Sequence, residues 1–161
     1  MKCVAIIQRR LKPGKTYDDY RKAWFHTKGF GVPTDMYTII NAFDPQEIIS
    51  IGIMQLSLEQ VPHVLQIDVT ERLKNSLDDV IEKTIIRHFG IIVAEDDFSS
   101  PDTLTYNPIS TVDGVVTNFT EGNDTIKKFA EMIAKASRER DQIKKETGTI
   151  QRKQDAKAQS D

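Results

Sequence analysis

The sequence has almost no cysteine or tryptophan and no long apolar run. Cys3 is the single cysteine and Trp24 the single tryptophan among 161 residues. One cysteine excludes an internal disulfide and a thiolate metal cluster, and it favours a reducing compartment. The longest apolar runs, such as residues 48–54, are too short to span a bilayer. We therefore expect a cytoplasmic protein that does not associate with membranes.

An excess of one charge is also missing. The chain has 22 Lys or Arg against 24 Asp or Glu, a net charge of −2, which gives no electrostatic reason to bind nucleic acid. It contains no Gly-rich phosphate loop, no nucleophile elbow and no close histidine pair, so the sequence predicts no cofactor and no metal. Hydrophobic residues make up 39%, enough for the core of one soluble domain.

Thr34 to Leu56 is the most informative stretch, and it predicts a β-hairpin. Residues 36–43 and 48–54 are rich in β-branched and aromatic side chains, as a buried pleated surface prefers. Between them, residues 44–47 predict a type I turn, because Pro45 presets φ and the Asp44 side chain can bond the backbone ahead.

The first helix is predicted between a strand at residues 3–9 and this hairpin. Thr16, with Asp19 three residues later, is typical of a helix N-cap. The helix carries an aromatic stripe that we expect to face the sheet, and two glycines and a proline are expected to end it. The stripe consists of Tyr17, Tyr20, Ala23 and Trp24, and the terminating residues are Gly29, Gly31 and Pro33.

A second helix and a last strand complete the predicted domain. Ser57 to Gln60 resembles a capping box, and the helical pattern after it continues to Leu73. Ser76 with Asp79 predicts a further helical turn, and residues 85–95 predict the last strand of the core.

The order strand, helix, strand, strand, helix, strand predicts an α+β fold. It is the split βαβ plan, a four-stranded antiparallel sheet with two helices on one face. The strands are apolar or small on both faces, so the face without helices needs a cover. We expect a second copy of the chain to supply it, as a two-fold homodimer.

These features together resemble a known superfamily. A strand, the loop at residues 11–15, an aromatic helix ending in Ala23-Trp24-Phe25 and a hairpin are similar to the dimeric α/β-barrel proteins, which include antibiotic-biosynthesis-monooxygenase-like and stress-responsive barrel proteins. The resemblance covers about residues 2–98. It implies a ferredoxin-like subunit, a dimeric barrel, and a cleft between sheet and helices. Some such proteins oxidise polycyclic phenols or quinols without metal or flavin, some bind or degrade haem, and some have no known activity.

The resemblance implies candidate site residues, because Asn, Trp, His and Arg side chains recur in those oxygenases. Each candidate also has a structural alternative: Trp24 as a core filler, His26 as a surface histidine, His88 as a hydrogen-bonded core or interface residue, and Asn41 as an amide that satisfies the helix layer. His88 is the preferred histidine, because it shares a strand face with Gly90 where an apolar residue would be expected. The candidate catalytic residues are His88, Asn41 and His26, and the candidate ligand-binding residues are Trp24, Tyr20, Tyr37 and Arg9.

The pattern of apolar and polar residues changes after residue 98. Residues 1–98 are predicted as the ferredoxin-like domain, 99–120 as a linker with short extended pieces and a turn at 113–114, and 121–161 as a helix and a polar tail. The helix is expected to begin at Asn123 or Asp124, with an apolar face, and the tail after Gly148 is expected to be disordered or a solvated helix. That face consists of Ile126, Phe129, Ala130, Ile133 and Ala136.

Three functions follow as hypotheses. The first is a cofactor-independent oxygenase or related enzyme that acts on an aromatic or polyketide-like molecule in the cleft. The second is a ligand-binding or haem-binding module that uses the same cleft. The third is an accessory or assembly protein that presents its C-terminal helix to a partner.

Overall fold

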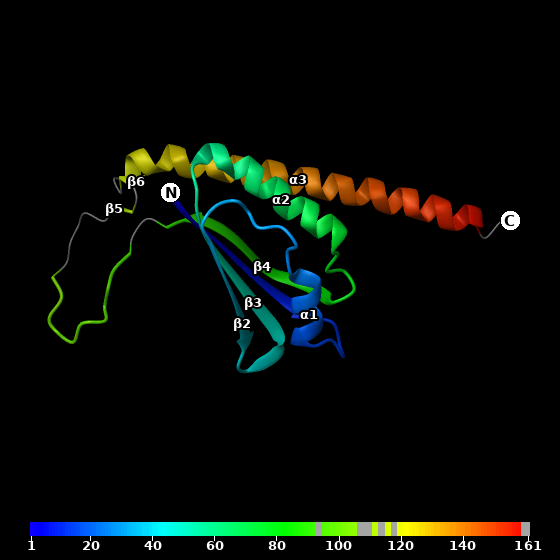
Figure 1. Cartoon of the computed structure of the whole chain (residues 1–161), viewed down its shortest axis with the longest axis horizontal. Helices are drawn as coiled ribbons and strands as arrows, with labels where there is room; N and C mark the ends of the chain where they lie inside the picture. The colour runs from blue at the N-terminus through cyan, green and yellow to red at the C-terminus, as the bar shows by residue number, and fades with distance from the viewer. Residues whose placement is uncertain (93–94, 106–110, 113–114, 117–118, 159–161) are drawn as a thin grey trace.

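The fold is a four-stranded sheet with helices stacked on one side (Figure 1). A computed structural model describes residues 1–92, 95–105, 111–112, 115–116 and 119–158. Its elements, in chain order, are β1 (Lys2–Leu11), α1 (Tyr17–Trp24), β2 (Thr34–Asn41), β3 (Asp44–Gln55), the 3-10 turn η1 (Leu58–Gln60), α2 (Val61–Lys74), β4 (Ile81–Ile91), the short pair β5 (Thr111–Val112) and β6 (Val115–Val116), and α3 (Phe119–Ala158).

The sheet order is β2-β3-β1-β4, and every neighbouring pair is antiparallel. This order and the alternation with α1 and α2 confirm the predicted α+β, ferredoxin-like plan. The third helix, α3, packs along α2 and β4 and continues past the sheet (Figure 1).

The strand register decides which residues face the helices. Ala5 of β1 is paired with Gly52 of β3 and with Phe89 of β4, and paired residues share a face of the sheet. These three lie on the helix side. The neighbours Ile6 and Ile51 lie on the other side, which no helix in the described part of the chain covers.

The core is divided into two clusters at opposite ends of β1. One cluster has Leu11, Tyr20, Ile48 and Val80 beneath α1, and the other has Cys3, Leu56, Val61 and Phe129 beneath α2 and α3. Cys3 and Leu11 lie eight strand positions apart, about 26 Å along an extended chain. The helix-side residues between the two clusters therefore lack the close packing found at either end.

The hairpin turn lies two residues earlier than the sequence predicted. Residues 42 and 43 form the turn, and Asp44 already pairs with Asn41 as the first residue of β3. The side chain of Arg10 on β1 explains the shift, because its Nη1 lies 2.7 Å from Asp44 Oδ2 and 3.3 Å from Glu47 Oε1. These ion pairs hold both carboxylates against the sheet, and they leave Phe43 99% exposed at the tip.

The predicted end of the first helix was also wrong. α1 ends at Trp24, because the backbone of Phe25 is extended (φ −61°, ψ 126°). The guanidinium of Arg72 on α2 donates to the carbonyl oxygens of Ala23 and Trp24, the last two helical residues. A cation on the final carbonyls is a favourable helix terminus. The predicted N-cap at Thr16 is confirmed, with a complete capping box to Asp19.

Two later boundaries differ as well. Ser76 to Val80 is a turn rather than a helix, and β4 begins at Ile81 instead of residue 85, because β1 pairs with it as far as Leu11. α3 begins at Phe119 rather than at residue 123 or 124, and it continues as a helix to Ala158. The turn predicted at 113–114 lies outside the described residues.

Candidate functional site

A cavity of about 400 Å³ lies between the sheet and the helices. This is within the size range of pockets that hold small organic molecules. It occupies the stretch between the two core clusters, where Ala5 and Ile7 of β1 form its floor. Most of its wall is apolar and comes from α2, α3 and β4, including Val64, Leu65, Phe89, Phe129 and Ile133.

His26 lies in this cavity, so the alternative interpretation of a surface histidine is wrong. Its side chain is only 11% exposed. Because α1 ends at Trp24 and residue 25 is extended, the chain turns back and carries His26 inward. The imidazole lies between two aromatic rings, with centroid distances of 5.9 Å to Trp24 and 5.0 Å to Phe30.

His26 faces a carboxylate on α2. Its Nε2 lies 3.4 Å from Asp68 Oδ1, while its buried Nδ1 has no hydrogen-bond partner among the described residues. Burial raises the pKa of Asp68, but the hydrogen bond and charge of His26 and the charges of Arg72 and Arg87 lower it by more. Asp68 is therefore ionised near neutral pH and can orient the ring with Nδ1 as the free acceptor.

A buried hydrogen-bond chain holds Arg9 at the floor of the cavity. Arg9 Nη1 donates to Tyr20 Oη at 2.9 Å, and that oxygen lies 2.6 Å from Ser50 Oγ. Arg9 is only 5% exposed. Arg9 and Ser50 line the cavity, whereas Tyr20 stands behind them in the core cluster under α1 and positions the guanidinium.

The loop after α1 is tied to α2 by Glu71. Both the amide and the hydroxyl of Thr27 donate to Glu71 Oε2, at 2.6 and 2.8 Å. These hydrogen bonds lower the pKa of Glu71 to about 2, and the one from the amide has the largest effect. Desolvation opposes the shift, and the charge and hydrogen bond of Lys74 add to it. The anchor fixes the segment that carries His26, and the next residue of α2, Arg72, lines the cavity.

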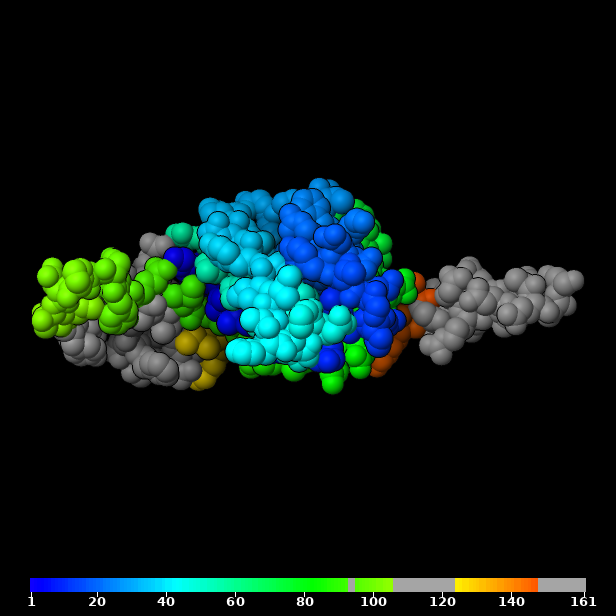
Figure 2. Space-filling view, turned by 90° about the horizontal axis from the view of Figure 1, so that it is seen from below, coloured from blue at the N-terminus to red at the C-terminus, as the bar shows by residue number. Residues whose placement is uncertain are grey.

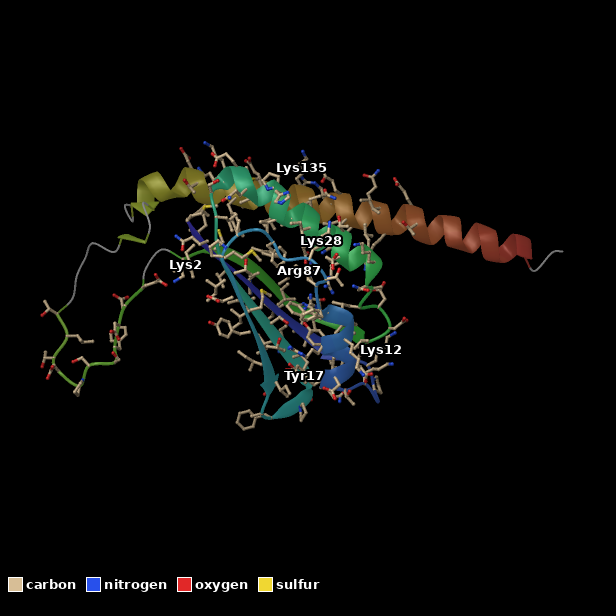
Figure 3. The ribbon with its side chains drawn as sticks, viewed as in Figure 1. Lys2, Lys12, Tyr17, Lys28, Arg87 and Lys135 are labelled. Carbon is tan, nitrogen blue, oxygen red and sulfur yellow. The ribbon has the colours of Figure 1, made fainter. Side chains whose placement is uncertain are left out.

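Charged residues of β4 and α3 form the polar side of the cavity. Arg87 of β4 lies in the space between β4 and α2 (Figure 3). From α3 come Arg140, paired with its neighbour Asp141 at 2.8 Å, and Lys144, which reaches Asp78 at 3.2 Å. The Lys144–Asp78 contact joins the C-terminal helix to the turn before β4.

An open groove of about 740 Å³ adjoins the cavity on the side of β2 and α1. The two share Trp24, His26, Phe30 and Met36. Figure 2 shows α1 and its loop, in blue, beside the β2–β3 hairpin, in cyan, on this side of the molecule. The aromatic group around His26 therefore separates the inner cavity from the surface.

The structure brings together some of the predicted site residues and separates the others. His26, Trp24 and Arg9 line the cavity, and Tyr20 supports Arg9. His88 and Tyr37 lie on the opposite face of the sheet, where they pair with Ile6 and Ile51.

Asn41 does not satisfy the helix layer, which was the structural alternative to its catalytic role. It ends β2 on the face away from the helices. There it donates to Glu47 at 3.1 Å and accepts from the amide of Phe43 at 3.0 Å. The hairpin turn fully accounts for this amide.

Apart from His26, Trp24 and Arg9, the polar residues of the cavity were missed at the sequence level, among them Asp68, Arg72 and Arg87. The sequence of α2 does contain a sign of two of them. Positions 61, 64, 68 and 72 share one helix face, and this face begins with apolar residues and ends with Asp68 and Arg72. A charge on the inward face of a helix needs a partner or a ligand. Arg87 alternates with the apolar Phe89 on β4, which indicates the same face.

Other kinds of site find no support in the described residues. They contain no group of three or more His, Cys, Asp or Glu placed to hold a metal ion. Within the same residues, no helix has the length and apolar character to cross a membrane.

Comparisons with known proteins give one structural match. No protein-family model matches the sequence, and no curated protein matches it. A solved structure from Chloroflexus aurantiacus J-10-fl, of a protein provisionally named an antibiotic biosynthesis monooxygenase, is similar in fold with a TM-score of 0.47 and 14% identity. The match covers 60% of this chain and 98% of that one.

Proposed function

We propose that the protein binds a small aromatic, polyketide-like molecule in the cavity and oxidises it with molecular oxygen, without a cofactor. The observation that carries this proposal is the His26–Asp68 pair at the edge of an apolar cavity of about 400 Å³. A histidine oriented by a carboxylate, with its other nitrogen free, is the arrangement of a general base. The apolar wall suits a flat aromatic body.

The chemistry begins with a proton. His26 Nδ1 accepts it from a phenol or an acidic C–H group of the substrate, and Asp68 stabilises the imidazolium that results. The electron-rich anion then reacts with oxygen, so that a ring CH₂ and O₂ become C=O and H₂O. Buried guanidinium groups next to the anion lower the energy of the charge that develops, and Arg72 and Arg87 line the cavity for this role.

We further propose that the protein acts as a two-fold homodimer. The middle of the sheet face away from the helices is apolar, with Ile6, Ile51 and the exposed side chains of Tyr37 and Ile39. Such a surface is costly in water, and a second sheet of the same kind would cover it. In that dimer His88 would lie between the two sheets, separate from the cavity.

Two histidine variants test the catalytic proposal against its alternatives. Phenols and quinones are first screened by thermal shift, because a ligand that binds the native state raises the midpoint. Oxygen uptake is then measured on the hits. We expect His26→Gln to bind ligand but to lose turnover by about 10²–10⁴-fold, the usual contribution of a general base. His88→Gln is the matched control and should keep full turnover.

Each other outcome points elsewhere. Loss of turnover in His88→Gln alone would move the active site to the face between subunits. Binding without any oxygen uptake would leave a ligand-binding module in place of an enzyme. A visible absorption band in the purified protein would refute the cofactor-free reaction.

A further inference from the structure

The charges that line the cavity are not balanced. In the described part of the chain, six Lys or Arg residues line it against four Asp or Glu. Three of the four carboxylates already have cationic partners: Asp78 with Lys144, Asp141 with Arg140, and Glu82 with Arg10 at 3.8 Å. Asp68 alone remains near the inner arginines, and it also serves His26.

The three inner arginines have almost no anionic partner. Arg9 donates to the neutral hydroxyl of Tyr20. Arg72 donates to two backbone carbonyls, and its Nε is buried without a hydrogen bond in the described structure. No hydrogen bond or ion pair joins Arg87 to any described residue, although Asp68 and Asp141 act on it at longer range.

The arginines also repel one another. Burial lowers the pKa of Arg72, the charge of Asp68 opposes this, and the charge of Arg9 lowers the pKa further. Burial also lowers the pKa of Arg87, and the charges of Arg140 and then Arg9 add to the effect. A guanidinium remains charged despite such shifts. Clustered, desolvated cations raise the free energy of the empty protein unless an anion offsets them.

We propose that the ligand of this cavity is an aromatic carboxylic acid whose carboxylate is held by Arg9, Arg72 and Arg87. This inference rests on the proposed function and specifies its substrate class. A carboxylate matches the planar fork of a guanidinium, which can bind it through two parallel hydrogen bonds. The unpartnered Nε of Arg72 provides one donor. The aliphatic and aromatic wall then takes the ring system, and the acid end lies at the arginines near His26.

Three probes that share one naphthalene ring separate the effect of charge from that of the ring. Binding of 2-naphthoate, 2-naphthamide and 2-naphthyl phosphate to the full chain is measured by calorimetry at one salt concentration. We expect the naphthoate to bind about ten- to hundredfold more tightly than the amide, as a charge-assisted hydrogen bond gives. Equal affinity for acid and amide would overturn the inference and leave the proposed function intact.

Arginine variants locate the effect. Arg87→Met should reduce the preference for acid over amide about tenfold while the amide affinity stays unchanged, and the unchanged amide affinity shows that the cavity is intact. The exposed Arg138 on the same helix as Arg140 does not line the cavity, so Arg138→Met should keep the full preference. If Arg87→Met does not fold, Arg87→Gln replaces it.

The remaining outcomes are also decisive. A phosphate that binds more tightly than the carboxylate would refute the carboxylate assignment. An unchanged acid preference in Arg87→Met would remove Arg87 from the anion site. If none of the three probes binds, this inference fails together with the aromatic ligand of the proposed function.

Discussion

Among the α3 residues whose burial the structure describes, Phe129 is the most deeply buried side chain. Phe129 is 6% exposed and packs with Cys3, Leu56 and Val61. Truncation of a buried Phe to Ala costs about 3–5 kcal/mol. One side of this ring faces the cavity instead of packed atoms, so we expect Phe129→Ala to fall at the lower end, about 3 kcal/mol. For a chain of this length that corresponds to about 6–12 °C in Tm.

Ile126 provides the matched control. It lies one turn earlier on α3 and is 38% exposed, and Ala raises helix propensity at both positions. We expect Ile126→Ala to change the free energy of unfolding by no more than about 0.5 kcal/mol. Urea unfolding followed by circular dichroism measures both variants, with the m-value as a check on the transition. Equal losses for the two variants would refute the docked position of α3.

Three further predictions follow from other parts of the molecule. The folded-state pKa of Glu71, about 2, lies below its usual value of 4.5. The stabilising effect of the ionised carboxylate is therefore complete above about pH 4.5 and is lost as pH falls toward 2. Glu71→Gln should show a shallower acid unfolding curve, and a curve identical to that of the wild type would contradict this. Ile39→Glu should sediment as a monomer because it places a charge on the open sheet face, whereas Ile143→Glu on α3 should sediment as the wild type does. If Ile39→Glu also sediments as the wild type does, the proposed dimer face is wrong. Deletion of residues 149–161, a segment without an apolar stripe, should leave Tm nearly unchanged, and a loss of many degrees would show that this segment packs.

The sequence predicted the fold well because hydrophobic periodicity reports it directly. Short apolar runs in β1 and β3 indicate strands, and the helical spacing of apolar residues in α2 indicates a helix. The hairpin turn was misplaced because its position depends on Arg10, which comes from another strand and holds Asp44 and Glu47. Local turn chemistry at Pro45 gave no sign of that long-range contact.

The candidate site was only partly predictable for a similar reason. Trp24 and Arg9 were identified by residue type, and the structure places both at the cavity. The orientation of His26 depends on where α1 stops, and Arg72 stops it from the distant helix α2. His88 was preferred because it shares a strand face with Gly90, and the structure places that face away from the cavity.

The position of α3 has a consequence for how the chain matures. Domains fold largely as they are synthesised, from the N-terminus onward. Residues 2–91 precede α3 in the chain, so the strands of the sheet emerge from the ribosome before α3 does. Until then Cys3, Leu56 and Val61 lack their cover by Phe129, and the nascent protein presents an apolar strip at that end. Closure of the cavity is thus a late event in biosynthesis, and a chaperone that binds apolar segments would find its target in that interval.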